Sequence, residues 1–261
     1  MSFITVNNLW KEYGDQVVLE NLNLSVKQGE FCTLVGASGC GKSTFLKMLL
    51  GQETQTRGEL LLDGAAFPAE PDRNRGIVFQ RYSVFPHLTV RQNVLMGLEL
   101  EQKPLLGMLF GSDRKDALAR VDAMLDSVGL SPSANKWPHE LSGGMQQRLA
   151  IAQSLIMRPR VLLLDEPFGA LDPGIRSDMH NLLLKLWQET GTTIFMVTHD
   201  LKEGFYLGTR LLVFDKTRHD PHSPSAYGAT ITYDLPIGRT DRAVLDDIDH
   251  SVARTARYQA A

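Results

Sequence analysis

A glycine-rich segment that joins an apolar run to an amphipathic run constrains the fold of this 261-residue chain more than any other feature. The run Phe31–Val35 predicts a buried strand, Gly36–Ser43 has the pattern Gly-x4-Gly-Lys-Ser, and Lys42–Leu50 predicts the helix that follows. The backbone N–H groups of such a loop can surround phosphates, while Lys42 contributes a charge and the Ser43 hydroxyl can bind Mg²⁺. A glycine-rich turn without a ligand is the alternative, but the flanking strand and helix favour a nucleotide site.

A second apolar run ends in two acidic residues. Val161–Leu164 predicts a strand buried on both faces of a parallel sheet, and Asp165 and Glu166 follow it directly. Open α/β sheets bind ligands at the carboxyl ends of their strands, which is where this pair would lie. Asp165 could hold Mg²⁺ through water, and Glu166 could orient or activate an attacking water molecule. The alternative is a strand that ends in solvated acids, which the upstream phosphate loop disfavours.

A second glycine-containing loop, Leu141–Arg148, lies between these two segments. Its start, Ser142–Gly144, comes directly before a predicted helix that runs to about Met157. The N–H groups and the positive dipole end of that helix would suit a γ-phosphate. A lone Ser-Gly-Gly is commonly only a helix N-cap, which is the alternative interpretation. The segment Leu-Ser-Gly-Gly-x-Gln-Gln-Arg, just before the acidic strand, also resembles a motif of a known protein family, and that resemblance disfavours a plain N-cap.

Together the three segments resemble the ATP-binding subunit of ATP-binding cassette (ABC) transporters, and the resemblance covers about residues 3–215. In that family two subunits hold ATP between them, and each offers its second glycine loop to the nucleotide of the other. The resemblance implies ATP and Mg²⁺ as cofactors, and an ATPase activity that is coupled to transport across a membrane. It also assigns Gln80 to the glutamine loop, His199 to a switch position near the γ-phosphate, and Asp172 to a segment that crosses to the partner subunit.

The family pattern gives several residues roles that they would not otherwise suggest. Without it, Gln80 would be a surface glutamine, His199 a structural histidine and Tyr13 a half-buried strand tyrosine. With it, Tyr13 is expected to stack on adenine. The site so implied has catalytic residues Glu166, His199, Lys42 and Gln80; Mg²⁺ ligands Ser43, Gln80 and Asp165; nucleotide contacts Tyr13, Gly36, Ala37, Ser38, Gly39, Cys40, Gly41, Lys42, Ser43 and Thr44; and contacts to the partner's nucleotide from Ser142, Gly143, Gly144 and Gln146.

The predicted strands indicate two kinds of sheet. Alternating apolar residues within 3–35 predict β structure, and the resemblance places it in an N-terminal antiparallel β subdomain. Short strands are predicted at Gly58–Asp63, which ends in an Asp-Gly turn, and at Gly76–Gln80. The continuous apolar runs Val161–Leu164 and Thr193–Val197 predict strands of a mostly parallel sheet. We therefore expect an α/β fold with the P-loop NTPase (RecA-like) core.

The predicted helices fall in the middle of the chain. Leu118, Val121, Leu125 and Val128 mark one face of a helix that Gly129 could end. A second helix should carry the apolar positions between residues 179 and 187 and should end at residue 191. A helical subdomain is expected at about residues 81–158, inserted in an ATPase domain that spans 3–239, and a tail at 240–261 should hold one weak helix.

Composition limits the partners and the cellular location that we expect for the protein. A formal net charge of −3 argues against a surface built for nucleic acid. No segment approaches the roughly 18 consecutive apolar residues of a membrane span, and the start lacks a secretory signal pattern. Cys32 and Cys40 are expected to be reduced thiols, because a disulfide would distort the phosphate loop. With the resemblance, these features predict a peripheral subunit at the cytoplasmic face of a bacterial inner membrane.

Several segments indicate an importer within the family. Met145, Phe85–Asn93 and Leu235–Arg239 resemble importer subunits for nitrate, sulfonate, taurine and related solutes. Expected partners are a second, identical ATPase subunit, separate transmembrane permease subunits and, indirectly, a solute-binding protein. An exporter subunit is the main alternative, because importers and exporters share the chemistry. A soluble cassette ATPase that acts on DNA or ribosomes, and a P-loop kinase, are weaker alternatives.

Two further segments carry hypotheses. Val84–Phe110 lies close to Gln80 and includes an apolar stretch, so it could form part of a docking surface for a permease helix; ordinary packing is the alternative. His219 and His222 lie in a proline-containing loop, but two histidines make an incomplete metal site.

Overall fold

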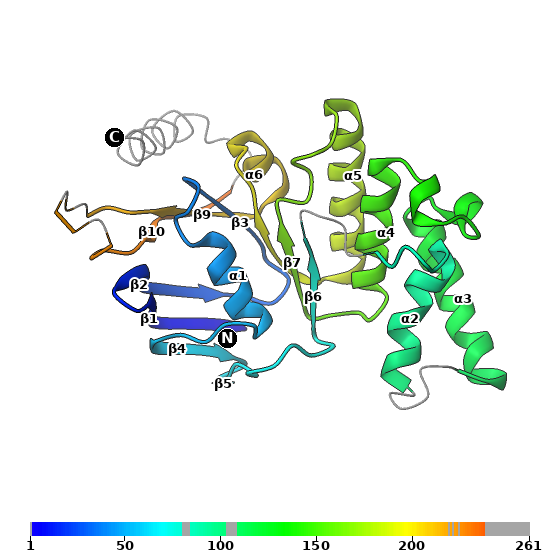
Figure 1. Cartoon of the computed structure of the whole chain (residues 1–261), viewed down its shortest axis with the longest axis horizontal. Helices are drawn as coiled ribbons and strands as arrows, with labels where there is room; N and C mark the ends of the chain where they lie inside the picture. Colours follow the sequence, from blue (N-terminus) through cyan, green and yellow to red (C-terminus); the bar gives the residue numbers. More distant parts are fainter. Residues whose placement is uncertain are drawn as a thin grey trace. The chain divides into compact units, whose positions relative to one another are not determined.

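The computed structural model of the chain describes residues 2–79, 84–102, 109–218, 220, 222–223 and 225–237. It divides into two compact units (Figure 1): unit 1 comprises Met1–Asp72 and Thr193–Ala261, and unit 2 comprises Arg73–Thr192. Within the described residues, no helix is long and apolar enough to cross a membrane. The expected tail helix, at 240–261, lies outside the described residues.

Unit 1 contains the expected antiparallel sheet. Its strands are β1 (Ile4–Tyr13), β2 (Gln16–Val26), β4 (Arg57–Leu62) and β5 (Ala65–Ala66), in the order β2-β1-β4-β5. The alternation in β2 places Leu22, Leu24 and Val26 in the core and leaves the residues between them exposed. Hydrophobic alternation thus sets which face of β2 is buried.

A second set of strands in unit 1 carries the phosphate loop. β3 (Phe31–Gly36) is parallel to β8 (Thr193–Val197) on one side and to β9 (Arg210–Asp215) on the other. β10 (Thr230–Pro236) is antiparallel to β9 and forms the edge. The strand β10 was not expected from the sequence.

Two helices pack on these strands. α1 (Lys42–Leu50) has the predicted bounds and contacts β3 and β8, whereas α6 (Leu201–Leu207) contacts β3 and β9. The ring of Phe45 on α1 lies 6.3 Å from that of Phe195 and 5.7 Å from that of Phe214. All three rings are fully buried, and each such side chain stabilises the fold by roughly 1.5–3 kcal/mol.

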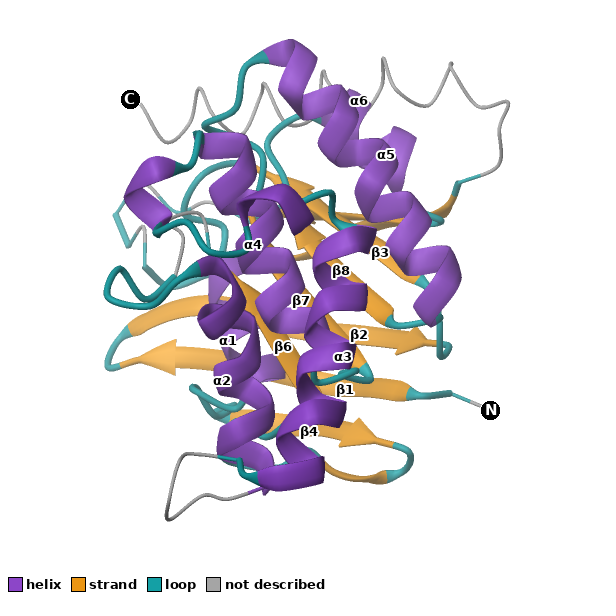
Figure 2. Ribbon diagram, turned by 90° about the vertical axis from the view of Figure 1, so that its right-hand side faces the viewer, coloured by secondary structure: helices purple, strands orange, loops and turns teal. Residues whose placement is uncertain are grey.

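Unit 2 contains most of the helices. It consists of β6 (Arg75–Val78), parallel to β7 (Val161–Asp165), with α2 (Val90–Gln102), α3 (Gly111–Ser127), α4 (Gly143–Leu155), α5 (Pro173–Thr190) and the short 3-10 helices Ser131–Ser133 and Pro138–Glu140. α2 and α3 lie side by side and α2 also contacts α4 (Figure 2). The helical subdomain at about 81–158 stays a prediction; α2, α3 and α4 fall within that range.

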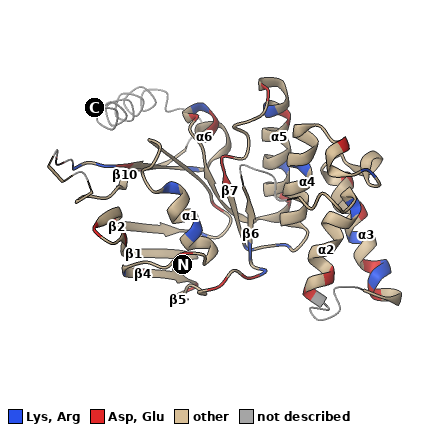
Figure 3. Cartoon of the chain, viewed as in Figure 1, with Lys and Arg blue, Asp and Glu red and all other residues tan. Residues whose placement is uncertain are grey.

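The face of α3 differs slightly from the expectation. Val121 and Leu125 are fully buried as predicted, but Ala117, in the second turn, is buried while the neighbouring Leu118 is half-buried. Helical spacing allows either residue on this face, because both lie three or four positions before Val121. Basic and acidic residues both occur along α3 (Figure 3), and Asp113, Lys115 and Asp116 are exposed, which is typical of a solvated helix surface.

Candidate functional site

The phosphate loop in unit 1 depends on a glycine at its first position. Gly36 has a φ of 146°, and a Cβ built there would collide with the backbone carbonyl oxygen of Phe214. Only glycine can therefore pass so close to β9 in this conformation. The chain then turns through Gly39 and Gly41, both with positive φ, and enters α1 at Lys42. This strand–loop–helix arrangement is the one that the sequence predicts.

Lys42 is buried inside this loop. The residue is only 5% exposed, and its Nζ donates to the carbonyl oxygens of Gly36 and Ala37 at 2.8 Å each. A third contact joins Nζ to the Cys40 Sγ at 3.5 Å. A buried ammonium requires hydrogen-bond acceptors, and here the loop itself supplies them. The loop thus encloses a positive charge at a helix N-terminus, which fits a polyphosphate.

The thiol of Cys40 shares this environment. Burial raises its pKa above the ordinary thiol range, and the nearby Lys42 ammonium opposes that rise. Cys32, on β3, is also a free thiol, and burial raises its pKa further. Both cysteines are therefore protonated at neutral pH, as expected for reduced thiols.

Tyr13 ends β1 with an exposed ring. The residue is 45% exposed, so the half-buried tyrosine that a strand alone would suggest is wrong. The Nζ of Lys11 lies 4.6 Å from the ring centroid. The pKa of Tyr13 is raised, chiefly by partial burial and to a smaller extent by a hydrogen bond with Glu53. An exposed ring at a strand end has a free area that a planar base could cover.

His199 lies in a turn after β8 and is exposed. The residue before it, Thr198, is buried, and the residue after it, Asp200, caps α6 by accepting the N–H groups of Lys202 and Glu203. The turn therefore presents His199 from a position fixed on both sides. Unit 1 thus brings together the phosphate loop, carried by β3, and the His199 turn, which follows the adjacent strand β8.

The acidic pair lies in unit 2, at the carboxyl end of β7. Asp165 and Glu166 are both half-buried. Glu166 has a φ of 50°, a left-handed conformation that is uncommon for a residue other than glycine. Its carbonyl accepts the N–H of Gly169 at 3.3 Å. Such backbone outliers concentrate at functional sites, and this one follows directly after the last residue of β7.

The second glycine loop in unit 2 begins α4. Ser142 is the N-cap and its hydroxyl accepts the N–H of Met145 at 3.4 Å, a capping contact that is compatible with the predicted role of this loop in phosphate binding. Ser142 and Gly143 are exposed, whereas Gly144 is buried. The amide of Gln146 donates to the carbonyl oxygens of Pro138 at 2.9 Å and Leu141 at 3.3 Å. Gln146 therefore braces the loop, a role that the sequence did not indicate.

Gly144 also packs against the segment that contains Asp172. A Cβ at Gly144 would lie 2.6 Å from the Cγ2 of Ile175, so glycine is needed for this approach. Asp172 is the exposed N-cap of α5, although its side chain makes no capping hydrogen bond, and Ile175 lies in the first turn. The structure therefore places the second glycine loop against the start of α5.

Some predicted residues lie outside the described part of the chain. Gln80 and His219 are among them, so their predicted roles stay predictions. Ser43 and Thr44 lie in the first turn of α1, as expected. In the part of the chain that the structure describes, no group of three or more His, Cys, Asp or Glu side chains could hold a metal ion. The hydroxyl of Ser43 and the carboxylate of Asp165 are oxygen donors of the type that Mg²⁺ prefers, and Mg²⁺ takes further ligands from substrate phosphates.

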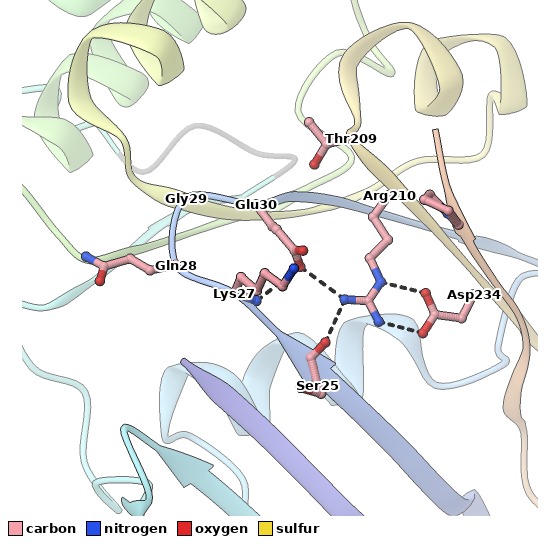
Figure 4. Close-up of a pocket in the computed structure, with 9 residues that line it drawn as sticks. Ser25, Lys27, Gln28, Gly29, Glu30, Thr209, Arg210 and Asp234 are labelled. Atoms are coloured by element: carbon pink, nitrogen blue, oxygen red, sulfur yellow. Dashed lines mark hydrogen bonds and ion pairs between the residues drawn. The ribbon is translucent and has the colours of Figure 1, made fainter. Parts of the chain in front are cut away.

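A groove of about 670 Å³ in unit 1 contains an arginine that the sequence did not single out. Arg210 donates to both carboxylate oxygens of Asp234, at 2.5 and 2.6 Å, to the carbonyl of Ser25 at 2.6 Å and to Glu30 at 3.0 Å (Figure 4). The hydrogen bonds to Asp234, above all, raise the Arg210 pKa. The guanidinium thus ties β9 to β10, to β2 and to Glu30 in the turn before β3, which indicates a structural role.

Comparisons with known proteins agree with this site. A family profile described as ABC transporter matches residues 19–169. The nitrate import ATP-binding protein NrtD of Synechocystis sp. is 42% identical over 223 residues, which are 85% of this chain and 78% of that protein. The aliphatic sulfonates import ATP-binding protein SsuB of Bacillus anthracis is 40% identical over 213 residues, covering 82% and 80%.

A solved structure agrees as well. The dimeric post-hydrolysis structure of the ATP-binding cassette MJ0796 bound to ADP and Pi has a TM-score of 0.71 and 29% sequence identity, covering 91% of this chain and 100% of that one. The expected fold class, an α/β P-loop NTPase core with an antiparallel β subdomain, is confirmed. The resemblance inferred from the motifs is confirmed too: this chain belongs to the ABC transporter family.

Proposed function

We propose that the chain is the ATP-hydrolysing subunit of an ABC importer, which drives a small polar solute through separate membrane permease subunits. The observation that carries the proposal is the phosphate loop, where a glycine-only backbone path encloses the buried Lys42 ammonium. Similarity to the import proteins NrtD and SsuB, at 42% and 40% identity, favours import over export, and a solute of the nitrate, sulfonate or taurine type is the candidate.

Nucleotide binding would rest mainly on unit 1. Lys42 would exchange its bonds to the loop carbonyls for the β- and γ-phosphates, because charged phosphate oxygens are stronger acceptors. Backbone N–H groups of residues 36–44 would surround the phosphates, and the exposed Tyr13 ring would stack on adenine. Ser43, Gln80 and Asp165 would hold Mg²⁺, which when bound supplies positive charge at the β- and γ-phosphate oxygens.

Hydrolysis would rest on positioning and charge. Glu166 would orient the attacking water and accept its proton, and the exposed His199 would contact the γ-phosphate. Lys42 and Gln80 would complete the catalytic set. Phosphoryl transfer needs little covalent participation from the protein, so held charges and a correctly placed water account for most of the rate.

Each nucleotide would be completed by a second, identical copy of the chain. Ser142, Gly143 and Gly144 begin α4, so their N–H groups and the helix dipole would suit a γ-phosphate. The exposure of Ser142 and Gly143 supports this contact with a partner. The Asp172 segment would cross to the same partner. In this arrangement the ATPase pair would sit as a peripheral subunit on the cytoplasmic face of the bacterial inner membrane, with a solute-binding protein acting indirectly.

Permease docking is the least constrained part of the proposal. The apolar face of α2, including Val94 and Leu98, is buried, which favours packing for that part of Val84–Phe110. Leu100 and Phe110, by contrast, are 48% and 66% exposed at the two ends of a segment that lies outside the described residues. We propose that this end of the α2–α3 pair contacts a permease. Serine replacements at Leu106 and Phe110 should then impair assembly and transport; unchanged transport by the folded double variant would remove this contact.

Replacing Glu166 by glutamine tests the proposed chemistry. The amide keeps the shape of the side chain but accepts a proton poorly, so steady-state ATP hydrolysis should fall to near background while ATP binding persists. Glu189→Gln, an exposed change on α5, is the matched control and should keep full activity. Near-normal hydrolysis by Glu166→Gln would remove Glu166 from its proposed role. Stimulation of hydrolysis by nitrate or by a sulfonate, in the complex with its permease, would identify the solute.

A further inference from the structure

A buried threonine and a buried glutamate lie on either side of His199 in the chain. Thr198 is 3% exposed and Glu203 is 7% exposed, whereas His199 is exposed. Thr198 extends the pairing of β8 with β3, because its N–H donates to the carbonyl of Leu34 at 3.1 Å. Glu203 lies in the first turn of α6. The two residues therefore belong to the elements that come before and after the histidine.

One hydroxyl joins these elements. The Oγ1 of Thr198 donates to the Oε2 of Glu203 at 2.5 Å and accepts the N–H of Asp200 at 3.1 Å. One bond leads to the residue that follows His199 and the other to helix α6 beyond it, so the hydroxyl links the chain on both sides of His199. A hydroxyl that donates and accepts at once fixes the path of the turn more tightly than either bond alone.

The far end of the turn is fixed independently. The Oδ1 of Asp200 accepts the N–H groups of Lys202 at 2.9 Å and Glu203 at 3.2 Å. The carbonyl of Gly204, one residue further along α6, accepts the Thr33 hydroxyl from β3 at 3.1 Å. The first turn of α6 is thus attached to the strand that leads into the phosphate loop. A change in the turn would therefore move His199 relative to β3.

Burying a carboxylate is costly, and apolar side chains of similar volume often stabilise a core as well or better. We infer that Thr198 and Glu203 are positioning residues, which hold the His199 backbone so that its imidazole meets the γ-phosphate. The inference rests on the proposed function, because it assigns the pair a role only through His199. Catalytic groups must be held within about 0.5 Å of their productive geometry, and this pair lies where that constraint applies.

Thr198→Val tests the inference, because valine keeps the branched shape and removes only the hydroxyl. The kcat for basal ATP hydrolysis by the full-length chain should fall about ten- to a hundred-fold, as expected if the His199 side chain is displaced by about 1 Å. The KM for ATP should change little. Thr198→Ser, which restores the hydroxyl, should recover most of kcat. Thr190→Val is the matched control, since that hydroxyl donates to a helix carbonyl on α5 and should be dispensable.

Combination with His199→Ala separates positioning from general stability. If Thr198 acts through His199, the double variant should be no slower than His199→Ala alone, because the losses are not additive. Single-turnover measurement gives the residual rates needed for this comparison. Should Thr198→Val fail to fold, the smaller Thr198→Ala takes its place with the same expected rates.

The outcomes are distinguishable. If His199→Ala is slow but Thr198→Val keeps its kcat per folded molecule, or if the two losses multiply, the positioning role is wrong and the proposed function stands. If His199→Ala hydrolyses ATP at the normal rate, the proposed role of His199 is wrong, and the inference falls with it. The inference is supported if kcat falls in Thr198→Val and recovers in Thr198→Ser, and if the loss is not additive with that of His199→Ala.

Discussion

Lys42 is a charged residue that the fold buries before any phosphate arrives. Its ammonium donates to two carbonyl oxygens of its own loop at 2.8 Å, so the charge is hydrogen-bonded rather than stranded. A phosphate therefore competes with neutral acceptors, which are weaker than anionic ones. This keeps the site intact without a nucleotide and still leaves a net gain when a nucleotide binds.

Cys40 offers a chemical probe of the same loop. Burial raises its pKa, so the reactive thiolate is scarcer at pH 8 than for a free cysteine, and alkylation should be slow there and accelerate as the pH rises above the ordinary thiol range. A group attached to this thiol, 3.5 Å from the Lys42 Nζ, would occupy space that the phosphates need. We expect alkylation to block ATP binding and prior ATP with Mg²⁺ to protect.

The control for that experiment is Cys40→Ser, which should keep ATP binding after the same treatment even though the buried Cys32 is still present. Labelling is followed by mass spectrometry and binding by equilibrium titration. Full ATP binding after complete modification of Cys40 would place the thiol outside the phosphate site.

At the scale of elements, the edge strand β10 is held by the hydrogen bonds and ion pairs of one side chain, that of Arg210, which we call the Arg210 bracket. Arg210, a β9 residue whose side chain is 18% exposed, joins this edge strand to β2 and to Glu30 in the turn before β3. Arg210→Ala would leave the exposed Asp234 and the half-buried Glu30 without this cation. We expect a loss of about 2 kcal/mol in the free energy of unfolding, within the range for hydrogen bonds to charged groups. Arg210→Lys should lose part of this, because lysine cannot bind a carboxylate through two parallel bonds.

Lys185→Ala provides the comparison, since it removes an exposed pair with Glu189 at 3.9 Å and should cost less than about 0.5 kcal/mol. Chemical denaturation of the three variants measures the differences. Equal stability of Arg210→Ala and Lys185→Ala would show that the bracket does not hold β10.

The contact between α4 and α5 predicts a steric coupling. Alanine at Gly144 would place its Cβ 2.6 Å from the Ile175 Cγ2, and such overpacking typically costs about 1–3 kcal/mol. Ile175→Ala removes that atom, so the double variant should recover most of the stability lost by Gly144→Ala. Thermal unfolding without nucleotide measures this apart from any role in hydrolysis. Additive losses in the double variant would contradict the packing account.

The sequence predicts elements well where hydrophobic pattern alone decides them. β8 and α1 have the bounds that continuous apolar runs and the loop pattern predict, and α4 begins directly after Ser142, where a helix was expected to begin. β10 was missed because its residues are only partly buried, and its pairing depends on Asp234 meeting Arg210, which lies 24 residues away. The bracing role of Gln146 was missed for a different reason: its partners are backbone carbonyls, which no residue pattern reveals.

At the scale of the whole molecule, the site residues show what one copy provides. Unit 1 carries the buried Lys42 and the turn of His199, and unit 2 carries Glu166 and the exposed start of α4 at Ser142. Family membership was predictable because three separated motifs occur in a fixed order, which chance rarely produces. The identity of the solute was not, since specificity would reside in other chains.

The central claim is that ATP is held jointly by two copies of the chain, and a crystal structure of Glu166→Gln with ATP and Mg²⁺ tests it most directly. The variant should trap the complex before hydrolysis. We predict a dimer in which each ATP contacts Lys42 of one copy and Ser142–Gly144 of the other. A single copy that encloses its own ATP, with both sets of contacts made within one chain, would contradict the account.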